Sequence, residues 1–195
     1  MAHLDRKRPD HFAKRAKAEG YAARSVYKLA EIDRRYRVLD RVHRVVDLGS
    51  HPGSWSALVR ERHPQTTLVG VDLQETPQYP GTQLVGSVAT VDPAEIERLL
   101  GGKADLLLSD MAPNTTGARL KDHVDQLDLV REAWRIARQV LRPGGTFVAK
   151  VFDGEDAPAL LDELRRSFDT FKRVRPEATR KDSREIFAVG LGFRP

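Results

Sequence analysis

The sequence predicts a doubly wound α/β fold, and the stretch from Arg44 to Trp55 is the first of two observations behind this prediction. The stretch begins with an apolar run that is typical of a buried strand. Gly49, Pro52 and Gly53 then suit a tight turn, and Ser54 offers a hydroxyl to cap a helix that runs to about residue 62. A strand, a glycine turn and a helix form the first unit of such a fold, which binds ligands at the carboxyl edge of its strands.

The second observation is an acid at the end of the next apolar run, Thr67 to Leu73. An acid such as Asp72 at the end of the second strand typically accepts hydrogen bonds from the two hydroxyls of a ribose. We therefore expect a cofactor that contains a nucleoside. The pattern differs from the dinucleotide fingerprint G-x-G-x-x-G, because Asp47 precedes the first glycine by two residues and Pro-Gly follows. The alternative is an ordinary strand-turn-helix unit in which Asp47 serves as a cap or loop acid.

The remainder of the chain alternates between helical and strand patterns in the same way. Helices are expected over residues 10–19, 24–36, 92–100, 122–141 and 156–168. Further strands are expected near residues 83–88, 104–110, 146–152, 171–174 and 184–193. Arg142-Pro143-Gly144-Gly145 should break the long helix over residues 122–141. Trp134 lies on the apolar stripe of that helix, so it should belong to the core. Without repeats or linkers, we expect a single domain over residues 1–195 with a basic helical segment at about 1–40.

Composition limits the class of protein. A chain of 195 residues is long enough for one α/β domain with a substantial core. It contains no cysteine, which excludes disulfides and thiolate metal sites and agrees with a cytoplasmic location. The first residues lack the apolar core of a signal peptide, and no apolar run approaches the length of a membrane span. We therefore expect no membrane partner.

The net charge of +5 is unevenly distributed. Residues 1–44 contain 13 lysines and arginines against 6 acids, whereas the remainder is slightly acidic. Basic segments of this kind commonly contact nucleic-acid phosphates, although a solvated helical face is the alternative. The candidate phosphate contacts are Arg6, Lys7, Arg8, Lys14, Arg15, Lys17, Arg24, Arg34 and Arg35.

Lys150 lies inside an apolar strand, where a lysine is costly unless it is paired or functional. Asp110 and Glu185 are acids at the ends of two neighbouring apolar strands. If the last strand is antiparallel, its start meets the other strand ends, and these three charged residues converge beside the cofactor. Lys28, on the basic helix, would cover them. On these residues alone, a catalytic group and a buried ion-pair network remain equally open.

Short sequence motifs around these residues resemble those of a known family. Asp-Leu-Gly-x-x-Pro-Gly-x-Trp, together with Asp72, resembles the first motif of class I S-adenosylmethionine-dependent methyltransferases. The words Ser-Val-Tyr-Lys-Leu, Ser-Asp-Met-Ala-Pro-Asn, Val-Ala-Lys-Val-Phe and Ser-Arg-Glu extend the likeness. From about residue 22 to residue 195, the chain resembles the FtsJ/RrmJ family of ribosomal RNA 2′-O-ribose methyltransferases. The resemblance implies a seven-stranded, Rossmann-like mixed sheet with helices on both faces and an inserted antiparallel last strand.

The resemblance also implies roles for individual residues. Its catalytic tetrad maps onto Lys28, Asp110, Lys150 and Glu185. The candidate contacts of S-adenosylmethionine are Asp47, Gly49, Gly53, Trp55, Asp72, Ser87 and Asp110. Ser87 departs from the pattern, because the family commonly has an acid there, near the adenine; Asp92 is a candidate substitute. Lys150 would act as general base or stabilise the developing alkoxide, with the Lys28 charge and burial disfavouring its protonated form.

The implied activity is methylation of a ribose 2′-hydroxyl, with a uridine of large-subunit (23S) ribosomal RNA as the target. Requiring a 2′-hydroxyl selects RNA over DNA. We expect a monomer, and no metal. The alternatives are a transfer RNA or cap ribose methyltransferase, a non-catalytic RNA-binding ribosome-assembly factor, and a base methyltransferase. The last usually carries Asn/Asp-Pro-Pro-aromatic after the fourth strand and flips its base, and Asp110-Met111-Ala112-Pro113 differs from that.

Overall fold

The computed structural model describes residues 11–113, 118–180 and 182–195. Its helices are α1 (His11–Ala18), α2 (Val26–Tyr36), α3 (Ser54–Arg62), α4 (Pro93–Leu100), α5 (Arg119–Val140) and α6 (Ala157–Arg165). Its strands are β1 (Arg44–Leu48), β2 (Thr67–Asp72), β3 (Thr82–Val85), β4 (Ala104–Ser109), β5 (Leu141–Phe152), β6 (Phe168–Val174) and β7 (Glu185–Phe193). The expected order of helices and strands is confirmed.

The strands form one mixed sheet in the order β3-β2-β1-β4-β5-β7-β6. Neighbours from β3 to β5 are parallel, whereas β7 is inserted between β5 and β6 and is antiparallel to both. The expected seven-stranded sheet with an antiparallel inserted strand is therefore confirmed. Because β7 runs backwards, its first residue, Glu185, pairs with Phe152 at the end of β5. Glu185 thus lies at the carboxyl edge of the parallel strands.

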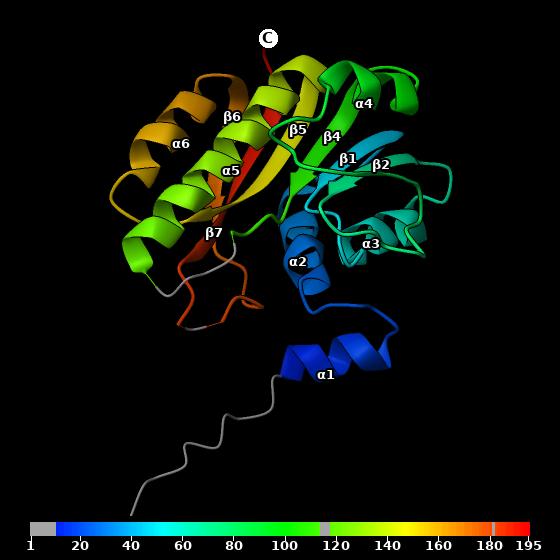
Figure 1. The fold of residues 1–195 in the computed structure, drawn as a ribbon, viewed down its shortest axis with the longest axis horizontal. Helices are drawn as coiled ribbons and strands as arrows, with labels where there is room; N and C mark the ends of the chain where they lie inside the picture. The colour runs from blue at the N-terminus through cyan, green and yellow to red at the C-terminus, as the bar shows by residue number, and fades with distance from the viewer. Residues whose placement is uncertain (1–10, 114–117, 181) are drawn as a thin grey trace, which may run out of the picture.

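Each face of the sheet is covered by its own set of helices (Figure 1). One core packs α4, α5 and α6 against the sheet, and the other packs α2 and α3 against the opposite face. Trp134 of α5 is 4% exposed and contacts the rings of Phe147, Phe168 and Phe193. Its expected place in the core is confirmed.

The boundary between α6 and β6 differs from the prediction. The helix ends at Arg165, and Phe168, expected as its last residue, is the first residue of β6. Phe168 is buried among Trp134, Phe147 and Phe193. The apolar stripe of the helix and the first apolar residue of the strand are adjacent in sequence. Periodicity alone therefore did not separate them.

The start of β5 and the cap of α3 also differ from the prediction. Helix α5 ends at Val140, just before Arg142-Pro143-Gly144-Gly145 as expected, but β5 begins at Leu141 rather than near residue 146, and these four residues form an irregularity within it. The pairing with β4 moves from Ala104–Leu141 to Leu106–Thr146 across this segment. Ser54 does not cap α3; its hydroxyl accepts a hydrogen bond from the backbone N–H of Ala23 instead. A contact distant in sequence thus replaces the local one.

The basic helix α1 lies beyond the end of the sheet at which β4 terminates (Figure 1). Phe12 and Arg15 of α1 both contact the ring of Tyr27 on α2, and Arg15 also pairs with Glu19. Of the candidate phosphate contacts, Arg6, Lys7 and Arg8 lie outside the described residues.

Among the described residues, no helix combines the length and the apolar character that a membrane crossing requires.

We expect Phe147→Ala to lower the free energy of unfolding by about 3–5 kcal/mol, because the ring is fully buried between Trp134 and Phe168 and its loss leaves a cavity. Urea denaturation followed by circular dichroism measures this. The control Leu120→Ala removes a side chain that is 75% exposed and should change the value by less than about 0.5 kcal/mol. A loss below about 1 kcal/mol for Phe147→Ala would contradict the packing described.

Candidate active site

The turn after β1 brings the backbone to the edge of a hollow. Gly49 has φ +76°, and an added Cβ there would lie 2.7 Å from Cγ of Met111. Gly53 has φ +93° immediately before α3. Both positions therefore exclude side chains, by backbone conformation and, at Gly49, also by close packing. The turn can present its backbone directly to a ligand at the carboxyl edge of β1.

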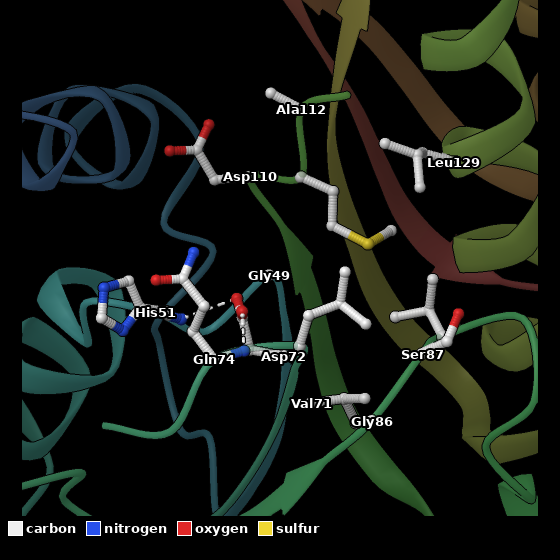
Figure 2. A pocket seen from close by; sticks show the side chains of 13 residues that line it. Gly49, His51, Val71, Asp72, Gln74, Gly86, Ser87, Asp110, Ala112 and Leu129 are labelled. Atoms are coloured by element: carbon white, nitrogen blue, oxygen red, sulfur yellow. Dashed lines mark hydrogen bonds between the residues drawn. The ribbon is translucent and has the colours of Figure 1, made fainter. Parts of the chain in front are cut away.

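Asp72, the last residue of β2, is held in a fixed orientation. Its two carboxylate oxygens accept hydrogen bonds from the backbone N–H groups of His51 (2.9 Å) and Gln74 (2.8 Å), which Figure 2 shows as dashed lines. The side chain lines a pocket of ≈ 330 Å³, which we call the Asp72 pocket. Each carboxylate oxygen has a second lone pair. Asp72 can therefore still accept hydrogen bonds from two neighbouring hydroxyls of a ligand.

The far end of the Asp72 pocket is lined by Gly86 and Ser87. A Cβ added at Gly86 would meet no heavy atom of the described residues within 4 Å, so the glycine borders open space. The Ser87 hydroxyl accepts a hydrogen bond from the backbone N–H of Ala89. Asp92 does not replace the missing acid, because it is the N-cap of α4, where it accepts from Ala94, and it does not line the pocket. This end of the pocket is uncharged.

Asp47 is fully buried, and its carboxylate accepts a hydrogen bond from the Ser56 hydroxyl at 2.6 Å. That hydroxyl also lies 2.7 Å from the phenol oxygen of Tyr79. Burial, reinforced by the charges of Asp110 and Asp72, raises the pKa of Asp47 to about 7, although the Ser56 hydrogen bond opposes the rise. Asp47 lines a second hollow of ≈ 230 Å³, which we call the Asp47 pocket, together with Gly49, Ser54 and Trp55. Gly53 does not line it.

Lys150 meets Asp110 at the ends of β5 and β4. The amine of Lys150 donates to the backbone carbonyl of Asp110 at 2.6 Å, and it lies 3.2 Å from the carboxylate oxygen Oδ1. The lysine side chain is 5% exposed and that of Asp110 is 18% exposed. Asp110 lines both the Asp72 pocket and the Asp47 pocket. Asp110 therefore stands at the junction of the two hollows, whereas Lys150 lines neither of them.

Lys28 reaches the same edge from α2. Its amine donates to Oε2 of Glu185 at 2.6 Å, and the lysine is 6% exposed. Burial by itself would raise the pKa of Glu185, but the charge and hydrogen bond of Lys28, together with the charge of Lys150, lower it below its usual range. Glu185 is therefore held as a carboxylate between two cations. The structure brings together all four residues that the sequence singled out.

A third hollow of ≈ 400 Å³ opens beside Lys28 and Glu185, and we call it the Glu185 pocket. Phe152, two residues beyond Lys150 on β5, lines it. It shares Ala23 and Ser25 with the Asp47 pocket, which in turn shares Asp110 with the Asp72 pocket. The three hollows thus follow one another along the carboxyl edge. Asp110 lies where the Asp72 and Asp47 pockets meet, Lys28 and Glu185 line the Glu185 pocket, and Lys150 lines none of the three but contacts Asp110.

Trp55 is 3% exposed and ties α3 to the start of α2, because its indole N–H donates to the carbonyl of Ser25 at 2.8 Å. It lines the Asp47 pocket. His51 lines both the Asp47 and the Asp72 pockets. Within the described ranges, no group of three or more His, Asp or Glu side chains is placed to hold a metal ion.

Several supporting residues were not found from the sequence. Gln126 of α5 is 1% exposed and donates to the backbone carbonyl of Lys150 at 2.9 Å, which fixes the strand where the lysine leaves it. Tyr79 lies in the segment of residues 76–81, for which no helix or strand was expected. Its phenol oxygen nevertheless lies within hydrogen-bond distance of the Ser56 hydroxyl, which donates to Asp47. Nothing in the local pattern around either residue signals these contacts, since both partners are distant in sequence.

Comparisons with known proteins identify relatives of this chain. A family model described as FtsJ-like methyltransferase matches residues 21–193. A protein of Rhizorhabdus wittichii named ribosomal RNA large subunit methyltransferase E is 42% identical over 98% of this chain and 84% of its own length. The protein of the same name from Caulobacter vibrioides is 40% identical over the whole chain and 86% of its own length. The crystal structure of a Plasmodium falciparum protein, titled as a ribosomal RNA methyltransferase, superposes with a TM-score of 0.78 at 26% identity, covering 89% of this chain and 98% of that one.

The raised pKa of Asp47 predicts how stability changes with pH. Its pKa is about 7 in the folded chain and has an ordinary value of 3.8, so the folded state holds the proton more tightly. The resulting stabilisation is complete below about pH 4 and is lost as the pH rises through 7. Relative to Asp47→Asn, wild type should lose roughly 2–3 kcal/mol of unfolding free energy between pH 5 and 8, as measured by urea denaturation. A difference that stays constant over this range would contradict the burial of an ionisable carboxyl here.

Proposed function

The chain belongs to the FtsJ-like methyltransferase family, and we propose that it transfers the methyl group of S-adenosylmethionine to a ribose 2′-hydroxyl of large-subunit ribosomal RNA. The target is a uridine of 23S ribosomal RNA. The observation that carries this proposal is the meeting of Lys150–Asp110 and Lys28–Glu185 between a pocket suited to a nucleoside and an open pocket on the basic side of the molecule.

The Asp72 pocket fits the nucleoside part of S-adenosylmethionine. Asp72 would accept the two ribose hydroxyls, and the open space beside Gly86 leaves room for the adenine. Ser87 offers a neutral hydroxyl there, so adenine is bound without the help of a charge. Gly49 and Trp55, which line the Asp47 pocket, would surround the methionine part, with Gly53 in the turn between them, and Asp110 would place negative charge near its cationic groups. When bound, this cofactor supplies an electrophilic methyl group on sulfur.

Lys150 is the residue that we assign to the ribose oxygen. The Lys150 amine donates a hydrogen bond to the backbone carbonyl of Asp110, whereas the carboxylate oxygen Oδ1, 3.2 Å away, is an ion-pair partner that accepts no hydrogen bond within the described residues. A direction therefore remains open toward the 2′-oxygen. As a neutral amine, Lys150 would accept the proton of the hydroxyl as the methyl group is transferred; as an ammonium, it would instead stabilise the negative charge that develops on the oxygen. Asp110 and Glu185 orient the lysines and the hydroxyl, and much of the rate comes from alignment.

The acceptor RNA would enter through the Glu185 pocket. Lys28 of α2 and Arg24, just before α2, line this pocket, and the ring of Phe152 offers a surface for a ribose or base. Beyond it lies α1 with Lys14 and Lys17 exposed, although Arg15 and Arg35 are already paired with Glu19 and Glu31. We propose that the protein acts as a monomer on RNA rather than DNA, in the cytoplasm and away from membranes, where large subunits assemble.

One assay separates this function from its alternatives. Large ribosomal subunits and transfer RNA from cells lacking the protein are incubated with it and with isotopically labelled S-adenosylmethionine, and the RNA is then digested to nucleosides. We expect the label in 2′-O-methyluridine of 23S ribosomal RNA. Label on a base or in transfer RNA would show a different methyltransferase. The absence of label in either RNA would favour an assembly factor that retained the fold.

Lys150→Ala should lower the single-turnover rate of methyl transfer by about 10²–10⁴-fold, because it removes the group facing the 2′-oxygen. The affinity for S-adenosylmethionine, measured by calorimetry, should change by less than about threefold, since the Asp72 pocket is untouched. The control Lys103→Ala removes an exposed lysine paired with Glu97 and should leave the rate unchanged. Wild-type turnover by Lys150→Ala would remove the assignment.

Affinity for RNA should fall steeply with salt, because the basic helix binds phosphates and releases counterions. A double substitution, Lys14→Ala with Lys17→Ala, should reduce the slope of log affinity against log salt by about 1–2. Filter binding between 50 and 300 mM salt is the measurement. An affinity that does not depend on salt would contradict a role for α1 in RNA binding.

A further inference from the structure

Helix α2 is joined to the connection between β6 and β7 at two points. Lys28 pairs with Glu185, the first residue of β7. One helical turn later, Oε2 of Glu31 accepts a hydrogen bond from the backbone N–H of Glu177 at 2.7 Å. Residues three apart lie on the same face of a helix. The same face of α2 therefore carries a proposed catalytic lysine and a second link to the opposite wall of the site.

Glu31 is an unusual residue for this place. It is 9% exposed although it is a carboxylate, and its other oxygen, Oε1, pairs with Arg35 at 2.5 Å. Burying a carboxylate is costly unless it is hydrogen-bonded and paired. An apolar residue would pack here without that cost, so the hydrogen bond to the Glu177 amide calls for an explanation beyond simple burial. Glu31 lines none of the three pockets.

The segment held by Glu31 forms one wall of the Glu185 pocket. Arg180, Asp182 and Ser183 line the pocket from this side, and Lys28 of α2 and Arg24, two residues before α2, also line it. The segment is braced internally, because a guanidinium nitrogen of Arg175 donates to the carbonyl of Ser183 at 2.6 Å. It is joined to α2 near its start by the Glu31–Glu177 hydrogen bond and just after its end by the Lys28–Glu185 pair.

We propose that Glu31 is a positioning residue for methyl transfer: by holding α2 against the β6–β7 connection, it keeps the Lys28 amine on Glu185. The proposal rests on the function proposed above. Glu31 does not touch the substrate or the cofactor, and it acts through Lys28. Losing the link lets the helix and the connection separate, and a small displacement of a reacting group is costly to the rate.

Glu31→Ala should lower the single-turnover rate about tenfold per folded molecule, with affinity for S-adenosylmethionine unchanged within about twofold. Glu31→Gln retains an oxygen for the Glu177 amide and should recover most of the rate. Hydrogen exchange at the Glu177 amide should be faster in Glu31→Ala than in wild type. A rate equal to wild type in Glu31→Ala would overturn the proposal.

The chain offers a matched control in Asp105. This acid is also 9% exposed, accepts backbone N–H bonds from His43 and Arg44, and pairs with Arg142, but it lies at the start of β4, at the other edge of the sheet. Asp105→Ala should lose stability yet retain the rate per folded molecule within about twofold. An equal loss of rate in both variants would mean that Glu31 contributes only to stability.

A double-mutant cycle tests whether Glu31 affects the rate of methyl transfer through Lys28. If Glu31 acts through Lys28, then Lys28→Ala combined with Glu31→Ala should be no slower than Lys28→Ala alone. Rate losses that multiply in the double variant would overturn the proposal. If Glu31→Ala does not fold, the same cycle is run with Glu31→Met, which keeps the length of the side chain but removes the carboxylate. A wild-type protein that fails to methylate ribosomal RNA would refute the proposed function, and this inference with it. An active wild type with an equally active Glu31→Ala variant would refute this inference alone.

Discussion

The arrangement of the site depends most on one requirement: Lys28 and Lys150 are buried at the carboxyl edge of the sheet, and each needs an acidic partner there. A lysine that is about 95% buried requires a carboxylate or an equivalent acceptor. β4 supplies Asp110 for Lys150, and only an antiparallel β7 can bring Glu185 to the same edge for Lys28. The inserted strand is therefore what allows two cations and two anions to meet without an unpaired charge.

This arrangement also explains the division of the site. Asp110 belongs to the charged group and to both pockets on the cofactor side, whereas Lys28 and Glu185 line the pocket on the basic side. Lys150 lines none of the three pockets and contacts Asp110. In the proposed function, a methyl donor bound on the cofactor side and a hydroxyl arriving from the basic side would meet beside these charged pairs, where the lysine amines are already oriented by their partners.

Much of the fold could be predicted from the sequence, because buried parallel strands are continuous apolar runs and two of them end on Asp72 and Asp110. The residues brought together at the site could be predicted as well, since a lysine in an apolar strand such as β5 is conspicuous. What failed were features decided by contacts distant in sequence. Ser54 caps nothing because Ala23 uses its hydroxyl, and Phe168 joins a strand because the aromatic cluster around Trp134 holds it there. Glu31 and Gln126 look like ordinary helix residues, and only the folded chain shows which backbone groups they bind.

The central claim of the proposed function is that Lys150 faces the ribose oxygen, between the pockets for the cofactor and the Glu185 pocket. A crystal structure of the protein with a non-reactive analogue of S-adenosylmethionine and a short RNA containing the methylated uridine would test it directly. The account predicts the 2′-oxygen within about 3 Å of the Lys150 amine, with the ribose beside Glu185. A 2′-oxygen more than about 5 Å from that amine, or a ribose on the opposite side of Asp110, would contradict it.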